Sequence, residues 1–266
     1  MVARKKKAKK KTSRRKNGND NPETLADLLA DQGFEGATSG SYAMPFLRIL
    51  QKLSPECDKD ETAYIKGAKP GMILHTVSKE VFGEVNLVPL KYRDTYIEWI
   101  PREKGGGFVS EWDALESMTL ERLSTTTRNE KNANILPNGN EFKLHSNYFC
   151  AFEHPDTGWE PVMVSMSASQ LKTSRIWLST LRKMTIEVDG ETYQAKNIRS
   201  FQWTFSTEKL SNDQGTWFGW TYEKTIDTLL LPEVGSIQET VVSVLDHNLL
   251  TYDRSQQNPT ESENAL

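Results

Sequence analysis

The sequence lacks the features that mark secreted or membrane-spanning proteins. Only two of its 266 residues are cysteines, Cys57 and Cys150, which is too few for a disulfide framework and fits a reducing compartment. No apolar run approaches the roughly 20 residues needed to cross a bilayer. The N-terminal charges are not followed by the apolar segment of a secretory signal. We therefore expect a cytoplasmic protein with no membrane partner.

Signatures of catalysis and of metal binding are absent as well. The glycine run at 105–107 has no Lys-Ser/Thr pair at the spacing of a phosphate-binding loop. His145, Cys150 and His154 lie close together in the sequence, but their spacing matches no usual set of zinc ligands. No Ser-His-Asp order or paired carboxylates stand out. We expect a binding protein rather than an enzyme, with no catalytic residue, no metal and no cofactor.

Charge is distributed very unevenly along the chain. Residues 1–20 hold ten Lys or Arg and one Asp, a net of +9, so the remaining 23 basic and 35 acidic residues give a net of −12. The basic arm consists mainly of Lys5, Lys6, Lys7, Lys9, Lys10, Lys11, Arg14, Arg15 and Lys16. Such a run neutralises phosphates without sequence preference. A solubility tail or a targeting signal would have the same composition, so this pattern alone does not decide between them.

Composition divides the chain into four parts. Residues 1–21 hold few hydrophobic side chains and are expected to be a disordered basic arm. Residues 22–41 are expected to form a short leucine-containing helix and a small-residue linker. Residues 42–250 hold the large aromatics and should form the folded domain. The polar residues 251–266 are expected to be a flexible tail.

The folded part is predicted to be mainly β with inserted helices. Short apolar runs separated by turn sequences predict seven or eight strands, and helical spacing predicts helices over 111–123, from Ser165 or Ser167 to about 184, and over 236–250. This arrangement is typical of a small curved sheet or a barrel. The fold class we expect is therefore α+β with a barrel-like sheet.

Residues 85–109 are expected to form a curved hairpin at the centre of this domain. Strand-forming aromatics alternate with charged residues up to Pro101, and glycines 105–107 permit a tight bend. A cationic groove with aromatic platforms is how proteins hold single-stranded nucleic acid. The residues that could supply this chemistry are Tyr92, Arg93, Tyr96, Trp99, Arg102, Lys104, Phe108, Lys172, Arg175, Lys183, Trp203, Trp217 and Trp220. The alternative is that these aromatics simply form the core of a twisted hairpin.

Several phrases of the sequence resemble a family of tailed-bacteriophage proteins associated with single-stranded DNA binding. These are PFLRILQKLSPE (45–56), YIKGAKPGMI (64–73), YIEWIPREKGGGFV (96–109), SASQLKTSRIWLSTLRK (167–183) and STEKLSNDQGTWFGW (206–220). The resemblance implies an OB-like barrel that binds single-stranded DNA in phage replication or recombination, in the host cytoplasm and beside other replication or recombination proteins. The alternative is a phage structural protein or replisome adaptor that acts through protein contacts. The sequence leaves open whether the protein forms a homo-oligomer.

Overall fold

The structure is a computed structural model that describes residues 44–130, 132–195, 197–213 and 215–228, with isolated positions between 231 and 239. The chain divides into two compact units, 1–38 and 39–266, and the first lies wholly outside the described residues. The predicted basic arm, the predicted helix and linker, the C-terminal tail and most of the predicted helix 236–250 also lie outside them. Each helix in the described part is too short or too polar to span a bilayer.

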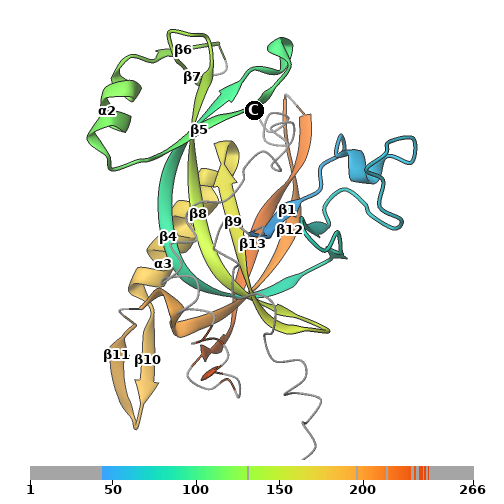
Figure 1. Ribbon diagram of the computed structural model, residues 1–266. Helices are drawn as coiled ribbons and strands as arrows, with labels where there is room; N and C mark the ends of the chain where they lie inside the picture. Colours follow the sequence, from blue (N-terminus) through green and yellow to red (C-terminus); the bar gives the residue numbers. More distant parts are fainter. Residues whose placement is uncertain are drawn as a thin grey trace, which may run out of the picture. The chain divides into compact units, whose positions relative to one another are not determined.

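One large sheet forms the second unit (Figure 1). Its strands, in spatial order, are β13 (Gly215–Asp227), β12 (Phe201–Asn212), β4 (Val85–Ile100), β8 (Glu141–His154), β9 (Gly158–Ser167), β1 (Phe46–Ile49), β2 (Ile73–His75) and β3 (Val81–Phe82). Neighbours are antiparallel except β1 and β9, which are parallel. The path of the sheet is therefore mainly a succession of antiparallel pairs.

Shorter elements are attached to this sheet. β5 (Gly107–Asp113) pairs with the second half of β4, and β7 (Asn134–Ile135) joins β6 (Thr127–Arg128) to the start of β8. β10 (Thr185–Val188) and β11 (Glu191–Gln194) form a separate hairpin. The helices are α2 (Ser117–Ser124) and α3 (Leu171–Lys183), with 3-10 turns η2 (Pro55–Cys57), η3 (Arg102–Lys104), η4 (Ala168–Gln170) and η5 (Ile198–Ser200).

The sheet curls into a half-barrel, as the arched strands in Figure 1 show. Register shifts interrupt β4 between Pro89 and Lys91 and β12 between Gln202 and Trp203. An extra residue of this kind bends a strand and increases its twist. The prediction of a mainly β fold with inserted helices and a curved, barrel-like sheet is confirmed.

Side-chain hydrogen bonds connect β12 and β13 to the segment between β1 and β2. The amide of Gln51, just after β1, donates to the carbonyl of Phe218 in β13 and accepts from its N–H, both at 2.9 Å. The hydroxyl of Thr207 in β12 donates to the carbonyl of Gly71. Gly71 has φ +91°, and a Cβ there would lie 2.7 Å from the Phe218 ring. Only glycine permits this close approach of the turn to β13.

The strands bury side chains on both faces of the sheet. Along β8, Tyr148 and Phe152 enter one hydrophobic cluster, while Phe149 and Ala151 enter a second cluster on the opposite face. Successive side chains of a strand point to opposite faces, so burial on both faces explains why this strand is apolar without alternation. The larger cluster is covered by α3, which contributes the fully buried Trp177.

Two predicted helix starts differ from the structure, and one hairpin was not predicted. β5 continues through Asp113, so the predicted helix at 111–123 begins only at Ser117. β9 continues through Ser167, which makes no side-chain cap, and α3 begins at Leu171. Pairing with β4 and β8 overrides the helical spacing in both places. The hairpin β10–β11 was not predicted, because its short strands carry few apolar residues.

Candidate nucleic-acid interface

α3 is an amphipathic helix with a cationic outer face. Ser174, Trp177 and Leu181 are buried against the sheet, and Trp177 packs on Tyr148 with ring centroids 4.3 Å apart. The predicted binding residues Lys172, Arg175 and Lys183 are exposed on the side opposite this buried face. Packing of the apolar face thus fixes the direction in which these predicted cations point.

No acidic side chain on α3 balances the positive charge of its outer face. Residues 171–183 include four basic side chains and no acidic one. None of Lys172, Arg175, Arg182 and Lys183 forms an ion pair with any residue that the structure describes. A shallow hollow on this face is lined by Arg175, Ile176, Ser179, Thr180 and Lys183. The Ile176 side chain, 52% exposed, gives it an apolar floor between cations.

A partly exposed aromatic row lies on β4, β5 and β8. The Tyr96 ring stacks on Phe142 with centroids 4.9 Å apart and 20° between the planes. Trp112, opposite Tyr96 on β5, lies under the Arg122 guanidinium at 5.1 Å. Burial raises the pKa of Tyr96, while the charge of Arg128 lowers it. Tyr96 therefore presents a half-buried ring close to cationic side chains.

Strand register places Tyr96 and the start of α3 at the same level of the sheet. Ser167, at the end of β9, lies opposite His145 of β8, which lies opposite Thr95 of β4. Tyr96 is the next residue along β4, and α3 begins four residues after Ser167. The start of the cationic helix and the ring of Tyr96 therefore belong to the same region of the fold.

Four tryptophans that were predicted to be platforms for stacked bases are buried in the structure. Trp99, Trp203, Trp217 and Trp220 are 4%, 2%, 9% and 2% exposed, so they have no open face on which a base could stack. Trp203 and Trp220 belong to the main core, and Trp99 makes an edge contact with the predicted Phe108, which is itself half-buried. Burial of these large rings stabilises the sheet, so the alternative that they are core aromatics holds for these four.

The predicted Tyr92 and Arg93 are engaged inside the sheet. Tyr92 packs against Tyr148 at 4.9 Å, and its hydroxyl donates to Asp94 at 2.6 Å. Burial, followed by the hydrogen bond to Asp94, raises the pKa of Tyr92 to about 12. Arg93 lies 3.5 Å from Glu111 in an ion pair. Both residues therefore act as structural groups in this conformation.

The predicted Arg102 and Lys104 lie at the exposed tip between β4 and β5, on the 3-10 turn η3. Below the tip, the buried carboxylate of Glu98 accepts hydrogen bonds from Asn138, Asn140 and Arg122. Burial by itself raises the pKa of Glu98, but the three donors together lower it below its ordinary value. This carboxylate joins the 134–140 loop and α2 to β4 and so holds the tip region in place.

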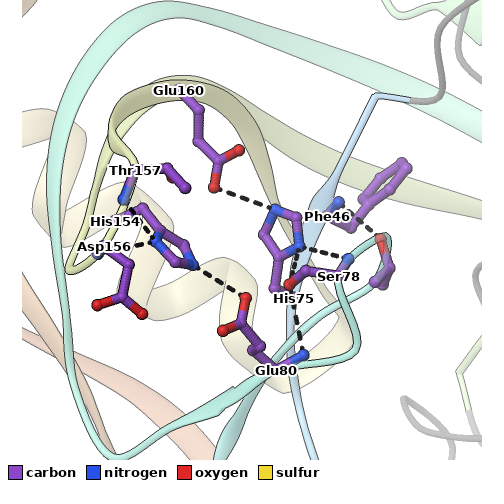
Figure 2. Close-up of polar contacts among 9 residues, drawn as sticks. Phe46, His75, Ser78, Glu80, His154, Asp156, Thr157 and Glu160 are labelled. Atoms are coloured by element: carbon purple, nitrogen blue, oxygen red, sulfur yellow. Dashed lines mark hydrogen bonds and ion pairs between the residues drawn. The ribbon is translucent and has the colours of Figure 1, made fainter.

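A histidine pair lies elsewhere, where the turns after β2 and β8 meet (Figure 2). Nδ1 of His75 accepts from the N–H of Ser78 at 3.0 Å, and its Nε2 lies 3.6 Å from Glu160. Nδ1 of His154 accepts from two backbone N–H groups, and its Nε2 lies 2.9 Å from Glu80. Both Nδ1 atoms are occupied by turn donors, so the imidazoles act as turn caps.

The three residues weighed as zinc ligands serve different places in the sheet. His145 contacts Ser165 and Trp99, while His154 caps the turn after β8. Cys150 is fully buried, and burial raises the pKa of its thiol. Within the described residues, no group of three or more His, Cys, Asp or Glu side chains could hold a metal ion.

The structure thus places Tyr96 at the level of the sheet where α3 begins, and it buries the four predicted tryptophans. Trp112, Arg122, Ile176 and the proximity of His75 to His154 were not predicted from the sequence. Trp112 was missed because it was assigned to a helix. Ile176 could have been found from its position four residues after Lys172, which puts it on the same outer face of the helix.

Comparisons with known proteins give one match. A family model described as "Pam3 phage gp34-like protein" matches residues 12–229, a span that includes β1 to β13. No curated protein and no solved structure matches the chain.

Proposed function

The chain belongs to the Pam3 phage gp34-like protein family, and on that premise we propose that this phage protein binds single-stranded DNA without sequence preference. The outer face of α3 carries the proposal, because four cations stand there with no acidic neighbour on the helix. Cations on an open face neutralise backbone phosphates, which supplies most sequence-independent affinity. The role we propose for it is in phage DNA replication or recombination.

Stacking adds the preference for single strands. Only unpaired bases can turn a ring face toward the protein. Tyr96, backed by Phe142, and the exposed Ile176 between Arg175 and Lys183 offer flat or apolar contacts beside cations. The buried tryptophans play no part in this interface. The N-terminal arm, with ten basic residues, adds a second electrostatic contribution.

Fluorescence anisotropy with labelled oligo-dT and with a duplex of equal length tests the proposal. We expect the full-length protein to bind the single strand more tightly and to lose affinity as salt rises. Absence of binding at low salt, or tighter binding to the duplex, would refute it.

The exposed apolar side chains of α2 and of the turn before it favour a second candidate function, that of an adaptor in a phage assembly. Leu115, Met118 and Leu120 are 89%, 61% and 55% exposed, and large exposed apolar side chains often mark protein contacts. A stoichiometric protein complex that survives nuclease treatment and is lost in Leu115→Ser/Met118→Ser would support this function. A complex unchanged by the two substitutions would count against it.

A further inference from the structure

The hairpin β10–β11 carries negative charge and follows directly on the cationic helix α3. Residues 184–195 contain Glu187, Asp189 and Glu191 and no basic residue. All three carboxylates are exposed, and none forms an ion pair with a described residue. Two adjoining elements of the fold therefore present uncompensated charges of opposite sign.

The hairpin holds its carboxylates in a fixed arrangement. Val188 pairs with Glu191 across a two-residue turn, and Asp189 and Gly190 have φ values of +53° and +78°. Positive φ at both turn positions is the pattern that matches strand twist in tight hairpins. Within the described residues, β10 and β11 pair only with each other. Such a two-stranded hairpin is only marginally stable alone and has two open edges.

The hairpin does not cover the α3 face of its own chain. The Gln194 side chain donates to the carbonyl of Arg182, and Ala195 donates to the carbonyl of Met184. These bonds fix the hairpin base at the C-terminal end of α3, and Figure 1 shows the hairpin extending beyond that end. Lys172 and Arg175 stand in the first half of α3, away from the hairpin tip.

The two surfaces also match in length. Four residues of β10 extend about 13 Å at a strand rise of about 3.3 Å per residue. Arg175 and Lys183 are eight residues apart, which corresponds to about 12 Å along a helix. β10 is therefore about as long as the stretch of α3 between the cations at the two ends of the hollow.

We propose that the β10–β11 hairpin of one copy docks on the outer face of α3 of a second copy. The two contact surfaces differ, so the contact can be exchanged reciprocally between two copies, which closes a twofold dimer, or can continue head to tail from copy to copy. The same α3 face is the proposed nucleic-acid site, but the association itself requires no nucleic acid.

Reciprocal charge reversal of the full-length protein, in the absence of nucleic acid, tests the docking. One variant carries Glu187→Lys/Glu191→Lys, and the other carries Lys172→Glu/Arg175→Glu. All four side chains are exposed, and Glu187 and Glu191 lie opposite Thr192 and Val188 and not opposite each other. We measure the weight-average mass by sedimentation equilibrium at about 0.01 M and about 1 M salt, where the screening lengths are about 30 Å and 3 Å.

We expect the unaltered protein to associate with rising concentration at low salt and to be monomeric at high salt. Each variant alone should be monomeric, and an equimolar mixture should associate again, because each then meets a face of opposite charge. Glu208→Lys/Glu223→Lys, at exposed positions of β12 and β13, is the matched control and should associate as the unaltered protein does. This control shows whether a change of net charge alone has an effect.

Three results would overturn the docking. The first is a monomer at every concentration in low salt. The second is association that both reversed variants retain. The third is association that survives reversal on α3 but is lost on deletion of residues 2–16, which would assign the partner surface to the basic N-terminal arm. Binding of a short oligo-dT by the hairpin variant is measured separately, so loss of association and loss of nucleic-acid binding are distinguishable.

Discussion

Replacing Lys172, Arg175 and Lys183 with alanine removes three cations from the outer face of α3 without touching its buried face. All three side chains are exposed and form no ion pair with a described residue, so the fold should be retained. If each cation contacts one phosphate, the proposed single-strand binding must become less dependent on salt.

The size of the effect follows from counterion release. Each phosphate contact to a single strand contributes about 0.7 to the slope of log Kobs against log salt, so three lost contacts flatten the slope by about 2. Between about 0.05 and 0.2 M salt, the affinity of the unaltered protein should then fall by roughly 20-fold more than that of the variant. Titration of labelled oligo-dT at five salt concentrations, read by fluorescence anisotropy, measures both slopes.

A matched control separates this contact from a general effect of charge. Lys52, Lys66 and Lys69 are also exposed and lie in the segments after β1 and before β2, so their triple alanine variant changes the net charge equally. Its slope should stay near that of the unaltered protein. Equal slopes for the α3 variant and the unaltered protein would refute the phosphate contacts proposed for α3.

Further predictions concern the ring faces, the histidine turns and the closure of the sheet. Trp203→Ala should destabilise the fold by about 3–5 kcal/mol, whereas Tyr96→Ala should leave the protein folded and weaken oligo-dT binding by about 1–3 kcal/mol. A stably folded Trp203→Ala variant with weakened binding, together with an unfolded Tyr96→Ala variant, would contradict the proposed interface. Burial, followed by the charge of His154, lowers the pKa of His75. The unfolded chain therefore binds this proton more readily, and urea midpoints should fall as pH drops below about 6.5, an effect that His75→Gln should reduce. Gln51→Ala removes two hydrogen bonds to β13 and should lower the unfolding free energy by about 1–3 kcal/mol, so an unchanged urea midpoint would show that this bridge contributes nothing.

The strands of this fold could be predicted where local pattern and tertiary packing agree. Pro101 and the glycines at 105–107 correctly placed the bend between β4 and β5, and His154 to Gly158 correctly placed the turn between β8 and β9. The start of α2 was misplaced because the residues of β5 have helical spacing, while their pairing with β4 keeps them extended.

The candidate site was harder to predict, because a sequence shows the kind of side chain and not its exposure. Trp203 and Tyr96 both occur in strand patterns that also contain charged residues, yet Trp203 is sealed by Trp177 and Tyr222, while Tyr96 keeps an open part. The cations of α3 were predictable, since helical periodicity alone assigns Lys172 and Arg175 to the side away from Trp177. Contacts between strands that are far apart in the sequence decide which aromatic rings stay exposed, and no local sequence pattern encodes these contacts.

Photo-cross-linking of full-length protein to an oligonucleotide that contains 5-iodouracil, with mass-spectrometric mapping of the attached peptides, tests the central claim most directly. We expect cross-links to Tyr96 and to peptides of α3, and their loss when unlabelled oligo-dT is added in excess. Cross-links confined to residues 1–21, or none under conditions where the oligonucleotide is bound, would contradict it.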